Sequence, residues 1–358
     1  MAHARYFLGV NSPRGFYSLY DQLIDPAQAR AYYILKGGPG CGKSFLMDRV
    51  GLRAEEAGYF VEYIQCSGNP GTVDGIYIPA LESAIVDGTA PHVIEPAYPG
   101  VVEDYINLGE YYDKTGLGDV RAEIMSCMEG YRDCCRRVYR CLGAASEIAG
   151  DMRAILVTQT LEEKASKRAK GIIAREFRKH RADTGRVVQR FLSSVTYEGI
   201  VCRFDTVDTL CSRVYEISDS YGLSHLLLSP ILSGATSAGY DVIACPSPMF
   251  PERLEHLIIP GLGLAFISSS AAMPYGQEPY RHIRMDAMTD ADVLHRNRAR
   301  LRFSKKVSAA LVEEAVDSLS QANVMNTTLE ALYQPYVNFS SIDQLADRIA
   351  DTLLGVST

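Results

Sequence analysis

The sequence predicts an α/β protein made of two similar halves, each with a mostly parallel sheet flanked by helices and followed by a helical segment. Three observations predict this fold class. A glycine-rich motif at residues 37–44 stands between an apolar strand pattern and a helical pattern. Residues 190–285 align with residues 6–103, which indicates an internal duplication. The stretch after each of these regions has helical apolar spacing and few strand signals.

Apolar periodicity and the placement of glycine and proline predict the elements of the first half. In chain order these are a strand over 5–10, a helix over 16–24 after the turn at 12–15, a strand over 31–35, a helix over 44–57 that Gly58 ends, and strands over 60–66, 75–78 and 81–86. The strands at 31–35 and 60–66, with the helix between them, form a βαβ unit of ordinary length.

The motif at residues 37–44 matches G-x-x-x-x-G-K-[ST], the phosphate-binding loop. Its glycines let the backbone wrap tightly, so that N–H groups point at phosphate oxygens at a helix N-terminus. Lys43 is expected on the β- and γ-phosphates and Ser44 on Mg²⁺. The expected binding residues are Gly37, Gly38, Pro39, Gly40, Cys41, Gly42, Lys43 and Ser44. The motif therefore predicts binding of a nucleoside triphosphate.

A second magnesium anchor is expected where a neighbouring strand ends. Asp87 follows the apolar strand at 81–86, and we predict that it binds Mg²⁺ beside Lys43. A turn aspartate before Gly88 is the alternative, and Asp74 is the competing carboxylate. His92 is a candidate for orienting water or sensing the γ-phosphate, although a histidine that packs a loop is the more common case. Candidates for stabilising transition-state charge are Arg14, Arg253, Arg281 and Arg284.

The helical segments set the predicted domains, which are residues 1–183 and 184–358. The first domain carries a helical extension over about 103–183, broken near 116–118 and Gly143, and the second carries one over about 286–358. Residues 164–190 are rich in Lys and Arg, which is compatible with contact to nucleic acid. A solvated helix face plus linker is the more common reason for such a run, and Phe177 and Phe191 stand alone without an interleaved pattern of aromatic residues to stack bases.

The duplication keeps a nearly constant offset along a dozen matches. Phe7 falls on Phe191, Gly15 on Gly199, and Gly40 on Gly222. The second copy of the loop, residues 218–226, keeps one glycine and has His225 and Leu226 where the first has Lys43 and Ser44. Leucine cannot bind Mg²⁺, and Asp219 would repel phosphate. We therefore expect one nucleotide per chain, bound by the first half.

Composition limits the classes of partner and compartment. A net charge of −7 gives no general reason to expect nucleic acid or an anionic membrane as partner. No stretch approaches the roughly 18 apolar residues that a membrane helix needs. The first residues lack the pattern of a secretory signal, and nine cysteines without a C-x-x-C pair suggest reduced thiols. A cytoplasmic protein is expected.

These residues resemble a bacterial family of tandem P-loop ATPases. The matching segments are Gly-Phe-Tyr-Ser at 15–18, the loop with its strand at 34–44, Gly-Tyr-Phe-Val-Glu at 58–62, Ile-Pro-Ala-Leu at 78–81, and Asp-Gly-Thr-Ala-Pro-His at 87–92. The resemblance spans the chain and is stronger in the first half. Members of the family often keep a phosphate loop in both halves, so the altered loop at 218–226 is a departure. The resemblance implies an ATP-binding protein that hydrolyses ATP.

Three functions follow from the motif and the resemblance. The first is an ATPase with Mg²⁺ at a single site, in which Lys43 and Asp87 take part in catalysis. The second is a small-molecule kinase, which the absence of Asp-Glu after the strand favours. The third is a nucleotide-dependent switch without turnover that contacts a protein partner, which the altered second loop favours.

Overall fold

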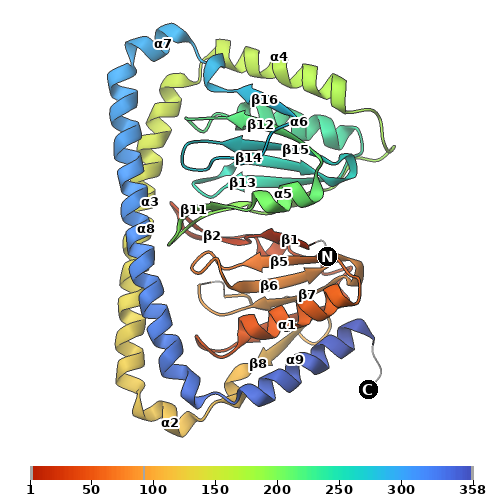
Figure 1. The fold of residues 1–358 in the computed structure, drawn as a ribbon, viewed down its shortest axis with the longest axis vertical. Helices are drawn as coiled ribbons and strands as arrows, with labels where there is room; N and C mark the ends of the chain where they lie inside the picture. The colour runs from red at the N-terminus through yellow and green to blue at the C-terminus, as the bar shows by residue number, and fades with distance from the viewer. Residues whose placement is uncertain (1–2, 92, 356–358) are drawn as a thin grey trace.

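The computed structural model describes residues 3–91 and 93–355. Two six-stranded sheets lie one above the other, and two long helices run side by side along one edge of both (Figure 1). The predicted α/β class, with mostly parallel sheets, flanking helices and a duplicated arrangement, is confirmed. None of the helices in the described part of the chain is both long and apolar enough to span a membrane.

The first sheet is built from residues of the first half only. Its strand order is β1-β5-β6-β7-β4-β8, and β6 alone is antiparallel to its neighbours. The helix α1 (Lys43–Glu56) packs on this sheet through buried Leu46, Met47 and Val50. The strand bounds are β1 His3–Tyr6, β4 Ala31–Lys36, β5 Val61–Gln65, β6 Val73–Ile78, β7 Ser83–Asp87 and β8 Glu103–Asn107.

The second sheet repeats this topology, with the order β9-β13-β14-β15-β12-β16 and β14 antiparallel. The helix α6 (His225–Ser237) corresponds to α1. The strand bounds are β9 Val187–Gln189, β12 Arg213–Ser218, β13 Val242–Ser247, β14 Phe250–Ile259, β15 Leu264–Ser269 and β16 Arg281–Arg284.

Two short hairpins and a shared core join the sheets. The first hairpin pairs β2 (Gly9–Ser12) with β3 (Gly15–Ser18), and the second pairs β10 (Ser193–Thr196) with β11 (Gly199–Cys202). The helix α5 (Phe204–Leu210) and the short 3₁₀ turn Tyr20–Gln22 each add a buried side chain, Val207 and Tyr20, to this core. One apolar cluster takes side chains from both sheets and both hairpins, so the halves share a continuous core.

Equivalent residues of the two halves have the same backbone conformation. Gly15 and Gly199 both have φ of +102°, a conformation that residues with a Cβ rarely adopt. In the two loops, Gly40 and Gly222 have φ of +67° and +70°. The halves meet through equivalent residues: the Phe7 amide donates to the Phe191 carbonyl (2.8 Å), and the Phe191 amide donates to the Phe7 carbonyl (2.9 Å). The halves are therefore related by an approximate two-fold axis that passes near this pair.

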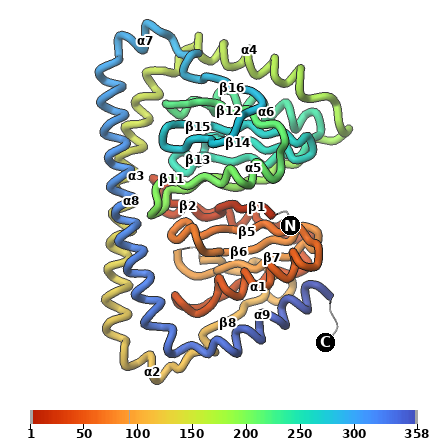
Figure 2. Tube along the Cα trace, in the orientation of Figure 1, coloured from red at the N-terminus to blue at the C-terminus, as the bar shows by residue number. Residues whose placement is uncertain are grey.

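The helices after each sheet pack on the other half. In the first half they are α2 (Lys114–Asp119), α3 (Arg121–Leu156) and α4 (Gln159–Glu176), and in the second α7 (Ala291–Arg296), α8 (Arg298–Tyr333) and α9 (Phe339–Leu354). The helices α3 and α8 run antiparallel along the molecule, so each crosses from its own sheet to the other (Figure 2). As a result α4 packs on α6 and α9 packs on α1.

The contact between α9 and α1 is stabilised by ion pairs as well as by apolar contact. Arg49 of α1 makes a two-pronged pair with Asp347 of α9, with nitrogen–oxygen distances of 2.9 and 2.7 Å, and Arg53 pairs with Asp351 at 2.7 Å. The apolar side of α9 is buried against α1 through Ile342, Ala346 and Ile349 among others.

Four element predictions are wrong. The single strand predicted over 5–10 is divided between β1, in the first sheet, and β2, in the first hairpin. Residues 16–24 contain β3 and a 3₁₀ turn instead of a helix, because Gly15 closes a hairpin and the aromatic pair Phe16 and Tyr17 extends along it. The edge strand β8 is missing from the predicted elements, since its sequence Glu-Asp-Tyr-Ile-Asn is largely polar. The predicted break at Gly143 is absent: α3 continues through this residue, which lies next to the Pro13 carbonyl of the hairpin turn.

Most of the basic stretch 164–190 is engaged within the fold. Arg181 pairs with Asp241 at 2.6 Å, Lys179 donates to the Ser237 carbonyl, and Arg190 is buried against Glu62. Lys167 and Lys170 lie beside Glu162 and Glu163 along one shallow groove of α4. Ion pairs and hydrogen bonds from this stretch therefore attach α4 and the following linker to the second half.

Candidate functional site

The loop at residues 37–44 connects β4 to α1 as the motif predicts. It follows the carboxyl end of β4, which lies between β7 and the edge strand β8 and is parallel to both. Gly42 begins the helix with φ of +84°, and Gly40 turns the backbone with φ of +67°. The amides of Gly40, Gly42 and Lys43 donate no hydrogen bond to any residue of the described chain. The loop thus presents a row of available donors at a helix N-terminus.

Lys43 lies folded over the loop. Its Nζ donates to the Gly37 carbonyl at 2.9 Å and to the Gly38 carbonyl at 2.8 Å, and it lies 3.6 Å from Asp87 Oδ2. The Lys43 side chain is about one-tenth exposed. A cation is therefore held at the mouth of the loop next to a carboxylate.

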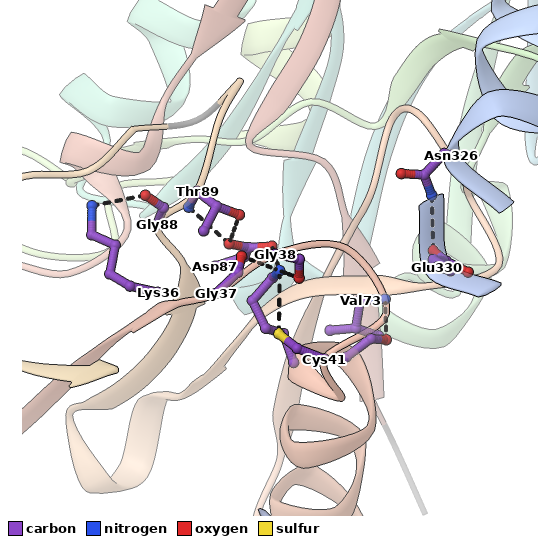
Figure 3. Close-up of polar contacts among 12 residues, drawn as sticks. Lys36, Gly37, Gly38, Cys41, Val73, Asp87, Gly88, Thr89, Asn326 and Glu330 are labelled. Atoms are coloured by element: carbon purple, nitrogen blue, oxygen red, sulfur yellow. Dashed lines mark hydrogen bonds and ion pairs between the residues drawn. The ribbon is translucent and has the colours of Figure 1, made fainter. Parts of the chain in front are cut away.

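Asp87 ends β7 beside the loop, as predicted (Figure 3). Its Oδ1 accepts hydrogen bonds from the Thr89 amide (2.8 Å) and from the Thr89 hydroxyl (2.5 Å). These bonds fix the carboxylate and leave Oδ2 toward Lys43. The structure thus brings together two of the predicted site residues from separate elements of the first half.

Ser44 and Asp87 are both oxygen donors of the kind that Mg²⁺ prefers. The Ser44 hydroxyl oxygen accepts the Val73 amide at 3.0 Å, which positions it at the start of α1. Magnesium is commonly held by one or two protein groups, substrate phosphates and water. The donor set therefore fits a Mg²⁺ ion that also binds phosphate oxygens. Among the residues described, no group of three His, Cys, Asp or Glu side chains could hold a metal by itself.

The rim of the loop comes from residues far away in the sequence. The Gly38 amide donates to the Tyr112 hydroxyl at 2.6 Å. Burial raises the pKa of Tyr112, so its phenol keeps the proton. From the second half, the last turns of α8 lie on the loop: an added Cβ at Gly40 would lie 2.8 Å from Glu330 Cα, and one at Gly38 would lie 3.1 Å from the Tyr333 ring. Glycine is required at position 40, where the backbone of α8 is this close and φ is positive, and a side chain at position 38 would require the Tyr333 ring to shift.

Glu330 is held in place by its own helix. Asn326 Nδ2 donates to Glu330 Oε1 at 2.8 Å, one turn earlier in α8 (Figure 3). Sequence reasoning missed Tyr112, Glu330 and Tyr333, because no motif marks them. The duplication offered an indirect signal, since the corresponding position in α3 is Arg153, which lies against Gly222 of the second loop.

The second loop, residues 218–226, is filled by one of its own side chains. Asp219 is buried, and its carboxylate accepts hydrogen bonds from the Ser224 amide (2.6 Å) and the Tyr221 amide (3.1 Å). Burial raises the pKa of Asp219, while these amides oppose that shift. Burial and the neighbouring Arg253 lower the pKa of His225 to about 4, so this histidine is neutral at pH 7 and does not replace the charge of Lys43.

We expect Asp219→Ala to lower the free energy of unfolding by about 1–3 kcal/mol, because buried amides lose their acceptor. Midpoints of urea unfolding measure this loss. Asp219→Asn is the matched control, since it keeps one oxygen in place and should cost less. Equal midpoints for Asp219→Ala and the parent protein would contradict the importance of this contact.

The other predicted residues lie at different distances from the loop. Asp74 is buried in β6, and its charge and that of Asp87 both act on buried Tyr20, so the two carboxylates share one neighbourhood. His92 lies outside the described residues. Arg253 lies beside His225 and Arg153 in the second half, and Arg281 and Arg284 are on β16 of the second sheet. Arg14 is in the turn of the first hairpin.

Comparisons with family models, with curated proteins and with solved structures gave no match to this chain.

Proposed function

We propose that the first loop binds ATP with Mg²⁺ and that the protein hydrolyses ATP at this single site in its N-terminal half. The motif, the N-terminus of α1, and the neighbouring Lys43 and Asp87 support the proposal. They correspond to the parts that phosphoryl transfer needs, namely positioned donors, a cation and a metal anchor.

The single observation that carries the proposal is the contrast between the two loops. In the second loop the amides of Tyr221 and Ser224 surround a carboxylate from the chain itself. In the first loop the position of Asp219 is taken by Gly37, and the amides of Gly40, Gly42 and Lys43 have no acceptor among the described residues. At one equivalent position, the Ser224 amide thus binds an internal carboxylate in the second half, whereas the Gly42 amide is available for an external anion in the first.

Each side chain then has a defined role. Lys43 would exchange its two carbonyl acceptors for the β- and γ-phosphate oxygens, which carry more negative charge. The phosphates would also take the Gly38 amide that now donates to Tyr112. Ser44 and Asp87 would hold Mg²⁺, which supplies neutralisation of the phosphate charge. Thr89 keeps Asp87 oriented toward this position.

A nucleotide-dependent switch is the second candidate, and the end of α8 favours it. Glu330 and Tyr333 belong to the second half but lie against Gly40 and Gly38. A triphosphate in the loop would press on this turn, and α8 is a continuous helix of 36 residues that leads to the second sheet. Binding energy could therefore be coupled to the second half with or without hydrolysis.

Measurements of phosphate release, label transfer and binding distinguish an ATPase, a kinase and a switch. The purified protein is incubated with ATP and Mg²⁺, alone and with a panel of metabolites. Phosphate release in the absence of a metabolite supports the ATPase, and transfer of label to a metabolite supports the kinase. Tight binding without either supports the switch. If neither ATP nor GTP binds to the parent protein, the proposal is wrong.

Asp87→Asn tests the role of the metal anchor. Because it keeps the size of the side chain but removes the charge facing Mg²⁺, we expect phosphate release to fall about tenfold to a hundredfold. The dependence of nucleotide binding on Mg²⁺ should weaken with it. Ser268→Ala, at the equivalent position of the second half, is the control and should leave both unchanged. An Asp87→Asn protein with normal turnover would remove Asp87 from the site.

A further inference from the structure

A cavity lies in the second half of the molecule, beside the altered loop at residues 218–226. It has a volume of about 520 Å³ and opens between Tyr221 of that loop and the start of α8. Leu294 and Leu301 supply an apolar part of the wall, and Arg298, Arg302 and Lys305 supply cations. The volume is within the range of small-molecule sites.

The spacing of the three cations in the sequence places them on one side of α8. Arg298, Arg302 and Lys305 are at positions i, i+4 and i+7 of α8, so they lie along one face of the helix. Lys305 Nζ lies 5.6 Å from the centre of the Tyr221 ring. Lys305 therefore lies over the Tyr221 ring, and Arg298 and Arg302 continue the row of cations along α8.

These charges are not neutralised by the protein. Within residues 3–91 and 93–355, none of the three side chains has an ion pair or a hydrogen bond, and no carboxylate lines the cavity. The acidic group that acts on Tyr221, Asp286, accepts the Ser220 amide at 3.0 Å and is not part of the wall. By contrast Arg300, on the same helix, pairs with Asp151 at 2.7 Å.

The positive charge of the cavity occurs in the second half only, because the equivalent positions of the first half lack two of the three cations. The helices α2 and α3 align with α7 and α8 without a gap, so that the first residues of α2 and α7, Lys114 and Ala291, fall on each other. At the positions of Arg302 and Lys305, the first half has Met125 and Met128. Pro39 stands at the position of Tyr221. Packing of the repeated helix pair therefore does not require these two cations or this ring.

We propose that this cavity binds a small molecule that carries two or three phosphate charges and a planar or apolar part. The cations would bind the phosphates with charge-assisted hydrogen bonds, and Tyr221 with the two leucines would contact the rest. The proposal goes beyond ATP binding by the first loop and does not depend on it.

The test uses the full-length Lys43→Ala protein, so that the first loop does not contribute. Pyrophosphate, ADP and inorganic phosphate are titrated calorimetrically at low ionic strength. We expect one equivalent of pyrophosphate and of ADP to bind, with inorganic phosphate weaker because it reaches fewer cations. Adding Arg302→Met and Lys305→Met, the residues of the first half, should weaken pyrophosphate binding roughly tenfold or more. Arg300→Met is the matched control and should have little effect.

The outcomes separate this proposal from the first one. Pyrophosphate binding that is equal in the protein with and without the two methionine substitutions would overturn the cavity assignment, as would no binding to the Lys43→Ala protein. Tighter binding of an acidic peptide than of pyrophosphate or ADP would also overturn it, in favour of a protein partner. Failure of ATP binding by the parent loop would leave these results unaffected.

Discussion

Lys43→Ala is expected to weaken ATP binding at the first loop by about tenfold to more than a hundredfold and to abolish ATP-dependent phosphate release. The side chain is the cation at the mouth of the loop, 3.6 Å from Asp87, and its removal leaves that carboxylate facing the phosphates alone. Loss of a charge-assisted contact weakens binding by about 1.5–3 kcal/mol, and the exposed repulsion from Asp87 adds to this. Equilibrium dialysis with ATP and Mg²⁺ measures binding, and a phosphate assay measures turnover.

His225→Ala supplies the matched control for this substitution. His225 holds the position of Lys43 in the second half, but its loop is filled by Asp219. We therefore expect the His225→Ala protein to bind ATP at the first loop with the affinity of the parent and to release phosphate at the same rate. Loss of ATP binding in His225→Ala but not in Lys43→Ala would place the nucleotide in the wrong half and refute the proposed site.

Arg190→Met is expected to be the most destabilising single change at the junction of the halves. Arg190 is 2% exposed, pairs with Glu62 at 3.1 Å, and donates to the carbonyls of Gln22 and Leu23. Removal leaves a largely buried carboxylate and two carbonyls without their donor. Breaking a buried pair in this way costs about 3–5 kcal/mol. The midpoint of urea unfolding should fall accordingly.

Two further variants make this prediction specific. Arg5→Met removes an exposed ion pair to Asp205 across the same junction, and we expect a loss of less than about 1 kcal/mol. The double variant Arg190→Met with Glu62→Leu should recover part of the stability, because no charge is then left buried alone. If Arg190→Met unfolds at the same urea concentration as Arg5→Met, the buried pair does not stabilise the junction.

Local signals predicted the site far better than they predicted its surroundings. The strand at 31–35, the helix at 44–57 and the end of β7 at Asp87 lie where apolar spacing and the motif placed them. These elements are set by contacts between neighbouring segments of one half and by glycine geometry. The duplication was readable for the same reason, since equivalent positions such as Gly15 and Gly199 need the same backbone conformation.

The errors came from elements whose patterns were ambiguous or long-range. Polar β8 is a sheet edge, where alternation of apolar residues is weak. The apolar stripe of α9 predicts a buried face but does not say that the partner is α1, in the opposite half of the chain. The placement of Glu330 and Tyr333 on the first loop follows from that exchange. No local pattern of residues contains this information.

The reciprocal bond between Phe7 and Phe191 has a consequence for the origin of this architecture. A contact in which a residue meets its own equivalent is the mark of an isologous interface, the kind that joins two identical subunits in a homodimer. The exchanged helices have the arrangement of a domain-swapped dimer, here within one polypeptide, and we infer that the chain arose by fusion of two such subunits. In a homodimer every substitution appears twice. Fusion removes that constraint, so that one loop could acquire a carboxylate of its own and a positive cavity beside it while the other kept Lys43.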